Sequence, residues 1–174
     1  MNRIFLFRNV LGWLLASSFL FSVEANAVMT LVDVSEQANI FYDPATIRRN
    51  GSIATVWEAV TYKNYVEAKG QQVKSSRVRV AYDCKNELYQ TQYHAGMSDR
   101  DGEGRAIDVL DYGVDGKWEV IDPSSLPYMV FALSCSGKSL PKPLADLNAK
   151  FQKYQISESE YLAKRDAYLK TLKQ

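Results

Sequence analysis

The chain has 174 residues, with 21 lysines and arginines against 20 aspartates and glutamates, so its formal net charge is +1 at pH 7. A nearly neutral chain argues against nucleic acid or an anionic membrane as the main partner. The length is that of one domain with a hydrophobic core, and the 11 tyrosines suit half-buried strands and binding surfaces.

Residues 1–27 predict a secretory signal peptide. Arg3 and Arg8 precede an apolar run at residues 10–23, and small residues follow up to Ala27, where cleavage is expected. The apolar run is shorter than the roughly 20 residues that a membrane-spanning helix needs. No cysteine follows the cleavage position, which argues against a lipid anchor, and no membrane span is expected in the mature chain. The protein is therefore expected to be exported, either periplasmic or secreted and at the cell surface.

Alternating apolar and polar residues predict an antiparallel sheet of about six strands. Strands are expected at residues 31–34 and 40–42, before a turn at Asp43-Pro44, and then at 52–62, 74–84, 87–95 and 105–112, with a short strand around Trp118. Residues 52–62 are apolar on both faces, which is typical of a central strand. Residues 63–73 and 96–104 contain glycine and polar residues, so they are expected to be loops.

The faces of two strands can be read from the same alternation. In residues 74–84, Arg77 and Arg79 share one face, and the apolar side chains share the other. Lys85-Asn86 is expected to turn the chain into the next strand, in which Tyr89, Thr91 and Tyr93 are expected to face together.

Cys84 and Cys135 are the only two cysteines of the chain. In an exported protein such a pair predicts a structural disulfide, here closing a loop of about 52 residues. A redox pair would be close in sequence, and a metal site would need more ligands than the single histidine, His94. Residues 126–136 predict a helix, begun at Ser124 or Ser125 and ended by Gly137. The disulfide is therefore expected to tie this helix to the strand that ends at Cys84, which makes the fold α+β.

Residues 139–174 predict a C-terminal helical extension. One helix can start at Pro143, and a second at Ser157, which forms a capping box with Glu160 while Ile156 and Tyr161 form a hydrophobic staple. Two readings stay open: a helical hairpin packed on its own sheet, or an apolar stripe that binds a partner or a second copy of the chain.

An ordered set of residues runs through the predicted strands and helix: Tyr42-Asp43, Trp57, Ser75-Ser76, Tyr82-Asp83-Cys84, Trp118-x-x-Ile121-x-Pro123-x-Ser125 and Cys135. This set resembles the surface-adhesin protein E family of small exported bacterial domains. The resemblance implies an antiparallel sheet with a helix tied to it by a disulfide, and, for host-associated members, attachment to extracellular host proteins. We therefore expect residues 28–138 to form the family domain. The chain departs from the family in lacking a lipidation cysteine and in continuing beyond Cys135.

Enzymatic chemistry has little support in the sequence. His94 has no serine or cysteine nucleophile nearby, and no nucleophile elbow or phosphate loop occurs. The motif Asp99-x-Asp101-x-Glu103-Gly104 resembles the start of a calcium loop, but its twelfth position is Leu110 rather than an acid, which favours a solvated loop. No enzyme activity, cofactor or metal is expected.

The sequence therefore predicts a binding protein with a protein partner, of the adhesin type. Arg77, Arg79 and Lys85 are the candidates for charge steering, and Tyr89 and Tyr93 are the candidate aromatic anchors. The plainer interpretation of the basic residues is an exposed sheet face whose charges deter edge pairing. Two other functions stay open: a periplasmic inhibitor or accessory factor that inserts the loop at residues 96–104, and a structural homodimer formed through the C-terminal helices.

Overall fold

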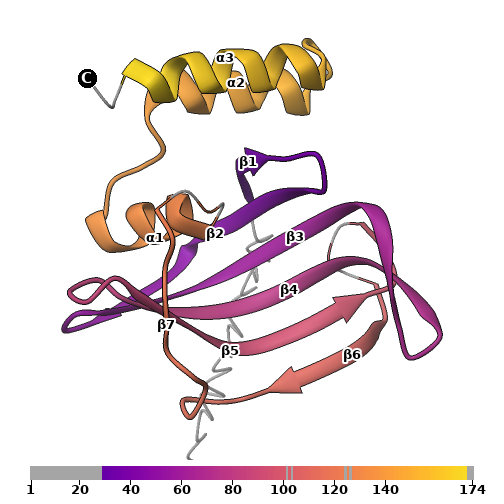
Figure 1. Ribbon diagram of the computed structural model, residues 1–174, viewed down its shortest axis with the longest axis vertical. Coiled ribbons are helices and arrows are strands. Elements are labelled where there is room, and N and C mark those ends of the chain that lie inside the picture. The colour runs from indigo at the N-terminus through magenta and orange to yellow at the C-terminus, as the bar shows by residue number, and fades with distance from the viewer. Residues whose placement is uncertain (1–28, 101, 103, 124, 126, 172–174) are drawn as a thin grey trace, which may run out of the picture.

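The computed structural model describes residues 29–100, 102, 104–123, 125 and 127–171, so the predicted signal peptide lies outside the described residues. Six antiparallel strands follow one another in chain order across one sheet (Figure 1): β1 (Thr30–Val34), β2 (Ala38–Asn50), β3 (Ile53–Ala68), β4 (Gln71–Asp83), β5 (Leu88–Met97) and β6 (Ala106–Asp111). The short strand β7 (Glu119–Val120) pairs with β5 near its start. The predicted sheet is confirmed, and the doubly apolar segment is the internal strand β3.

Two segments expected to leave the sheet are part of it. The predicted loop at residues 63–73 is mostly strand, because β3 and β4 continue until only Lys69 and Gly70 turn the chain. Both residues have positive φ angles, 51° and 69°, as a tight hairpin of twisted strands requires. The expected turn at Asp43-Pro44 instead lies inside β2, where the pairing with β3 shifts register between Asp43 and Arg48.

Three helices follow the sheet: α1 (Pro127–Ser136), α2 (Lys142–Gln152) and α3 (Glu158–Thr171). α1 packs on the sheet face that carries Val56, Val80 and Tyr82, and we call this the helix face. The main core lies between them and comprises Val32, Ile40, Tyr42, Val56, Val80, Tyr82, Ile121, Val130, Phe131, Leu133, Leu140 and Leu144. The opposite side, which carries the side chains of Trp57, Arg77 and Arg79, we call the open face.

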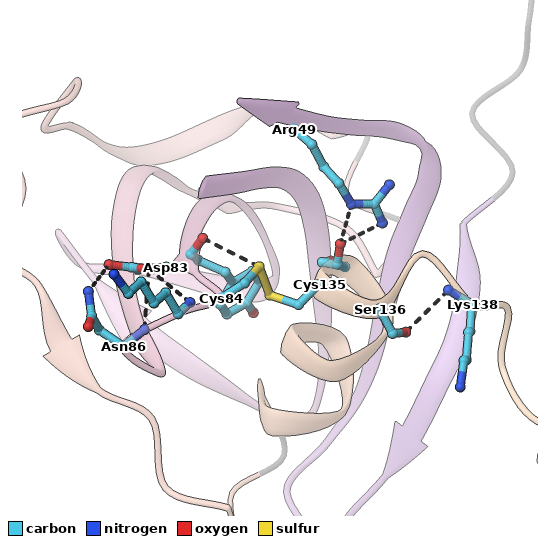
Figure 2. The surroundings of a disulfide bond; sticks show 10 residues. Arg49, Asp83, Cys84, Asn86, Cys135, Ser136 and Lys138 are labelled. Carbon is cyan, nitrogen blue, oxygen red and sulfur yellow. Dashed lines mark hydrogen bonds between the residues drawn. A yellow bond between two sulfur atoms is a disulfide. The ribbon is translucent and has the colours of Figure 1, made fainter. Parts of the chain in front are cut away.

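The predicted disulfide between Cys84 and Cys135 is confirmed, with the two Cα atoms 5.4 Å apart (Figure 2). It joins the last turn of α1 to the end of β4. Beside it, the Arg49 guanidinium donates from Nε and Nη2 to the carbonyl of Ser134, at 2.9 and 2.6 Å (Figure 2). A cation on a late helical carbonyl is favourable because that end of a helix carries partial negative charge.

The C-terminal helices pack on the edge strand β1 of the same chain (Figure 1). A second core cluster joins Leu31 and Val34 of β1 to Leu147 of α2 and Tyr161 of α3. The expected cap of the last helix is present, because Ser157 Oγ accepts from the Glu160 amide at 3.2 Å. Of the two readings of the extension, packing on its own sheet is therefore the one observed. In the part of the chain described, no helix is long and apolar enough to cross a membrane.

Candidate binding face

Three neighbouring strands bring an aromatic and cationic cluster together on the open face. Trp57 of β3 pairs with Arg79 of β4, which pairs in turn with Tyr93 of β5. The Trp57 and Tyr93 rings meet edge to face, with centroids 5.4 Å apart and planes at 67°. The guanidinium carbon of Arg77 lies 5.5 Å from the centroid of the Trp57 ring, which is within cation–π range.

Tyr93 reaches this face because of a β-bulge. Val80 pairs with Thr91, whereas Arg79 pairs with Tyr93, so β5 has one extra residue at Gln92. The bulge reverses the alternation of side chains beyond it. The expectation that Thr91 and Tyr93 face together is therefore wrong, and Tyr93 joins the arginines instead.

Small residues beside the cluster leave it recessed. Arg77 has a buried alanine opposite it on each neighbouring strand, Ala59 and Ala95. Trp57 stands between two hollows, one of about 290 Å³ and one of about 240 Å³. The first is lined by Thr46, Arg48, Thr55, Val56, Trp57 and Arg79, and the second by Trp57, Arg77, Tyr93, Ala95, Met97 and Ala106. We call Arg48, Trp57, Arg77, Arg79 and Tyr93 the open-face site.

Among the described residues, the arginines of the open-face site have no carboxylate partner. In the described part of the chain, none of the ion pairs involves Arg48, Arg77 or Arg79. Among the described residues, the Arg48 guanidinium donates to the carbonyls of Ala45 and Ile47 alone. Arg79 Nε is buried and has no hydrogen-bond partner among the described residues. Because a buried polar group without a partner costs free energy, we expect this guanidinium to donate hydrogen bonds to an external acceptor such as a carboxylate.

The other two predicted binding residues lie elsewhere. Lys85 is in the hairpin between β4 and β5, beyond the strands that carry the open-face site. Tyr89 lies on the helix face, where it pairs across the strands with Tyr82 and donates to Glu119 Oε2 at 2.9 Å. That hydrogen bond to a carboxylate raises the pKa of Tyr89. Sequence reasoning missed Trp57 and Arg48, although strand alternation did place the two arginines of β4 together.

The loop expected to insert into an enzyme is fastened to its own sheet. Ser75 Oγ donates to the Asp99 carbonyl at 2.6 Å, and Thr61 Oγ1 donates to the Arg100 carbonyl at 2.7 Å. The amide of Gly102 in turn donates to Ser75 Oγ at 3.1 Å. The calcium-like motif includes Asp101 and Glu103, which lie outside the described residues. Among the residues described, no group of three acidic, histidine or cysteine side chains could hold a metal ion.

Comparison with known proteins gives a family and a set of similar folds. Residues 29–136 match the family model described as Surface-adhesin protein E. A crystal structure of protein E from non-typeable Haemophilus influenzae is similar with a TM-score of 0.49 and 11% identity, covering 84% of this chain and 92% of that one. Crystal form II of Haemophilus influenzae protein E has a TM-score of 0.48 and 15% identity, covering 65% and 98%. No curated protein sequence matches the chain.

Proposed function

Because the chain belongs to the surface-adhesin protein E family, we propose that it is an exported, non-enzymatic protein that binds another protein through the open-face site. The observation that carries the proposal is the cluster of arginines beside Trp57 and Tyr93, which form no ion pair with any described residue. Tryptophan, tyrosine and arginine are the residues that contribute most binding energy at protein interfaces.

The chemistry of the site supports an acidic segment of an extracellular protein as the partner. Guanidinium groups bind carboxylates through paired hydrogen bonds, which gives both orientation and energy. The hollows on either side of Trp57 offer room for the side chains that flank such a carboxylate. Long-range attraction to a negative surface also speeds association at low salt.

The direct test is a double reversal of charge in the open-face site. The mature protein is applied to an array of acidic peptides from extracellular proteins, beside the same peptides with Asn and Gln in place of Asp and Glu. We expect Arg77→Glu with Arg79→Glu to weaken binding to the acidic peptides at least tenfold and to reduce its dependence on salt. The neutral peptides should bind weakly to every variant.

A matched control changes the same amount of charge away from the site. Lys138→Glu with Lys150→Glu alters two exposed residues near and in α2 and should leave binding within twofold of the parent. If the two double variants lose binding equally, net charge rather than the open-face site is responsible. If neither loses binding while both stay folded, the site is not the binding surface.

Location is tested separately by protease treatment of intact cells, followed by detection of the chain in surface, periplasmic and medium fractions. Loss of the chain from intact cells supports a surface adhesin. Protection until the outer membrane is opened contradicts surface display and directs the search to periplasmic partners.

A further inference from the structure

The two edge strands of the sheet, β1 and β6, differ in whether other parts of the chain cover them. On β1, the carbonyls of Leu31 and Val34 accept hydrogen bonds from Asn148 Nδ2 at 2.5 Å and Arg165 Nη1 at 2.6 Å. The C-terminal helices therefore close this edge. β6 forms the other edge, at the opposite end of the sheet from α2 and α3 (Figure 1). Within the described chain, no strand pairs with the outer side of β6.

The β6 edge lacks most of the features that block edge strands. Its sequence, Ala-Ile-Asp-Val-Leu-Asp, contains neither lysine nor proline. Val109 is 45% exposed and Leu110 is 42% exposed, on opposite faces of the strand, and Tyr112 just beyond it is 48% exposed. An apolar edge with free backbone groups is a template for one more strand.

A hollow lies beside this edge on the helix face. Its volume is about 590 Å³, which falls within the range of ligand pockets. It extends from Val78 on β4, across His94 on β5, to Leu110 on β6, and its full lining is Val78, Tyr89, Thr91, His94, Leu110, Tyr112, Gly116, Lys117 and Glu119. A strand added to β6 would place every second side chain on the same face as this hollow.

We propose that β6 docks an extended peptide segment of a partner protein as an additional strand, with a large apolar or aromatic side chain of that segment seated in the hollow. Backbone hydrogen bonds to the edge supply affinity, and the hollow supplies specificity for alternate side chains. Nothing in this step uses the open-face site, which lies on the other side of the sheet.

The charge at the edge favours a peptide with basic residues. Asp108 is already paired with Lys69, Nζ to Oδ1 at 2.6 Å. Among the described residues, Asp111 Oδ1 accepts only from the Gly113 amide, at 3.0 Å, and has no cationic partner. Pairing with the β6 edge of a second copy would bring two sets of these aspartates to one seam, whereas a lysine or arginine on the incoming strand balances Asp111.

The experiment selects peptides on the mature chain, residues 28–174, from a phage-displayed library of linear nonapeptides. Enriched sequences should alternate apolar with polar residues and carry lysine or arginine. The best peptide is then synthesised with single backbone N-methyl groups at successive positions. Because only alternate amides of an added strand face β6, N-methylation should weaken binding at least tenfold at every second position and little in between.

His94 reports occupancy of the hollow directly. It is the only histidine in the chain, so its imidazole resonances are assigned without ambiguity. Addition of the peptide should shift them. Leu110→Lys should reduce peptide affinity at least tenfold, whereas the matched control Val120→Lys, at an apolar residue that is 77% exposed on β7, should leave it unchanged. Both variants are first checked for the parent's melting temperature.

Four results would overturn the proposal: no enrichment of alternating sequences, N-methyl effects without a two-residue period, unshifted His94 resonances, or equal losses in the two lysine variants. A dimeric mass of the free chain that falls to monomeric with Leu110→Lys would also overturn it, because the occupant of the edge would then be a second copy. Arg77→Glu with Arg79→Glu should not affect this peptide, so the failure of the open-face proposal and the failure of this one are distinguishable.

Discussion

Glu58 is a carboxylic acid buried on the helix face of the sheet. It is 6% exposed, and its cross-strand neighbours are Tyr42 and Val78, neither of which is cationic. Among the described residues, the one hydrogen bond to its carboxyl group comes from the Tyr82 hydroxyl, which donates to Oε1 at 2.6 Å. Loss of hydration raises the pKa of Glu58 to about 7, and the bond from Tyr82 opposes that rise only in part. The core is therefore sensitive to pH near neutrality.

We predict that Glu58 lowers the stability of the protein as the pH rises. The folded-state pKa of about 7 exceeds the ordinary value of 4.5, so the folded chain holds this proton more tightly than the unfolded chain. The contribution to the free energy of unfolding is complete below pH 4.5 and is lost as the pH rises through about 7. Urea denaturation should show a decline approaching about 3 kcal/mol between pH 4.5 and pH 8 from this group.

The substitution Glu58→Gln tests this prediction, because glutamine cannot ionise and its carbonyl can still accept from Tyr82. The variant should be as stable as the parent near pH 4.5 and more stable at pH 8. Glu67→Gln changes an exposed acid of the same strand and should reproduce the parent's pH profile. An unchanged pH profile in the Glu58 variant would show that the carboxylate is charged at no cost in the folded protein.

The C-terminal helices act as a cover for one edge of the sheet. Arg165 donates to the Val34 carbonyl and to Asp33 Oδ1, at 2.6 and 2.5 Å. Asn148 donates to Leu31 and accepts from the Tyr161 hydroxyl at 2.8 Å, so a buried polar residue is satisfied on both sides. Edge strands with free carbonyls and apolar side chains associate, and these contacts remove that hazard.

We predict that deletion of residues 139–174 causes self-association. Truncation uncovers the β1 carbonyls together with Leu31 and Val34, which are 1% and 0% exposed in the intact chain. Sedimentation velocity should show a mass that rises with concentration, whereas the intact chain should not change in this way. A homodimer formed through the helices would give the opposite result, a lower mass after truncation.

A full-length variant is the control for misfolding of the shortened chain. Arg165→Met removes the bonds to Val34 and Asp33 but retains the helix and most of its packing. It should show weaker association of the same kind. If both proteins are folded and stay monomeric at every concentration, the uncovered β1 edge does not cause self-association.

At the scale of the whole molecule, local patterns in the sequence predict much of this fold. Alternation identifies the strands, a doubly apolar run identifies β3 as internal, and the two cysteines predict the bond from β4 to α1. The same alternation puts Arg77 and Arg79 on one face. These features depend on neighbours within a few residues or on the chemistry of a single pair.

Features that depend on pairing between distant segments could not be predicted in this way. The bulge at Gln92 is a mismatch between β4 and β5, and it decides which face Tyr93 occupies. Trp57 joins the open-face site through its register with Arg79, and that register depends on both the tight turn at Lys69-Gly70 and a register shift of β3 on β4 between Thr61 and Val66. The sequence likewise allowed two positions for the C-terminal helices, and contacts with a distant strand, such as those of Leu147 and Tyr161 with β1, select one.

The disulfide is a single residue pair that affects the stability of the whole domain. It closes the part of the chain that contains β5, β6, β7 and α1 into one loop. Cys84→Ser with Cys135→Ser should lower the free energy of unfolding in urea by roughly 4 kcal/mol, since the open chain has more unfolded conformations to lose. α1 is still held by burial of Val130, Phe131 and Leu133, so the variant should fold and keep the open-face site intact. Binding of acidic peptides below the melting temperature should therefore be within twofold of the parent. A loss of stability with unchanged binding assigns the disulfide to the stability of the domain alone, whereas loss of binding in a folded variant would show that α1 positions the strands of the opposite face.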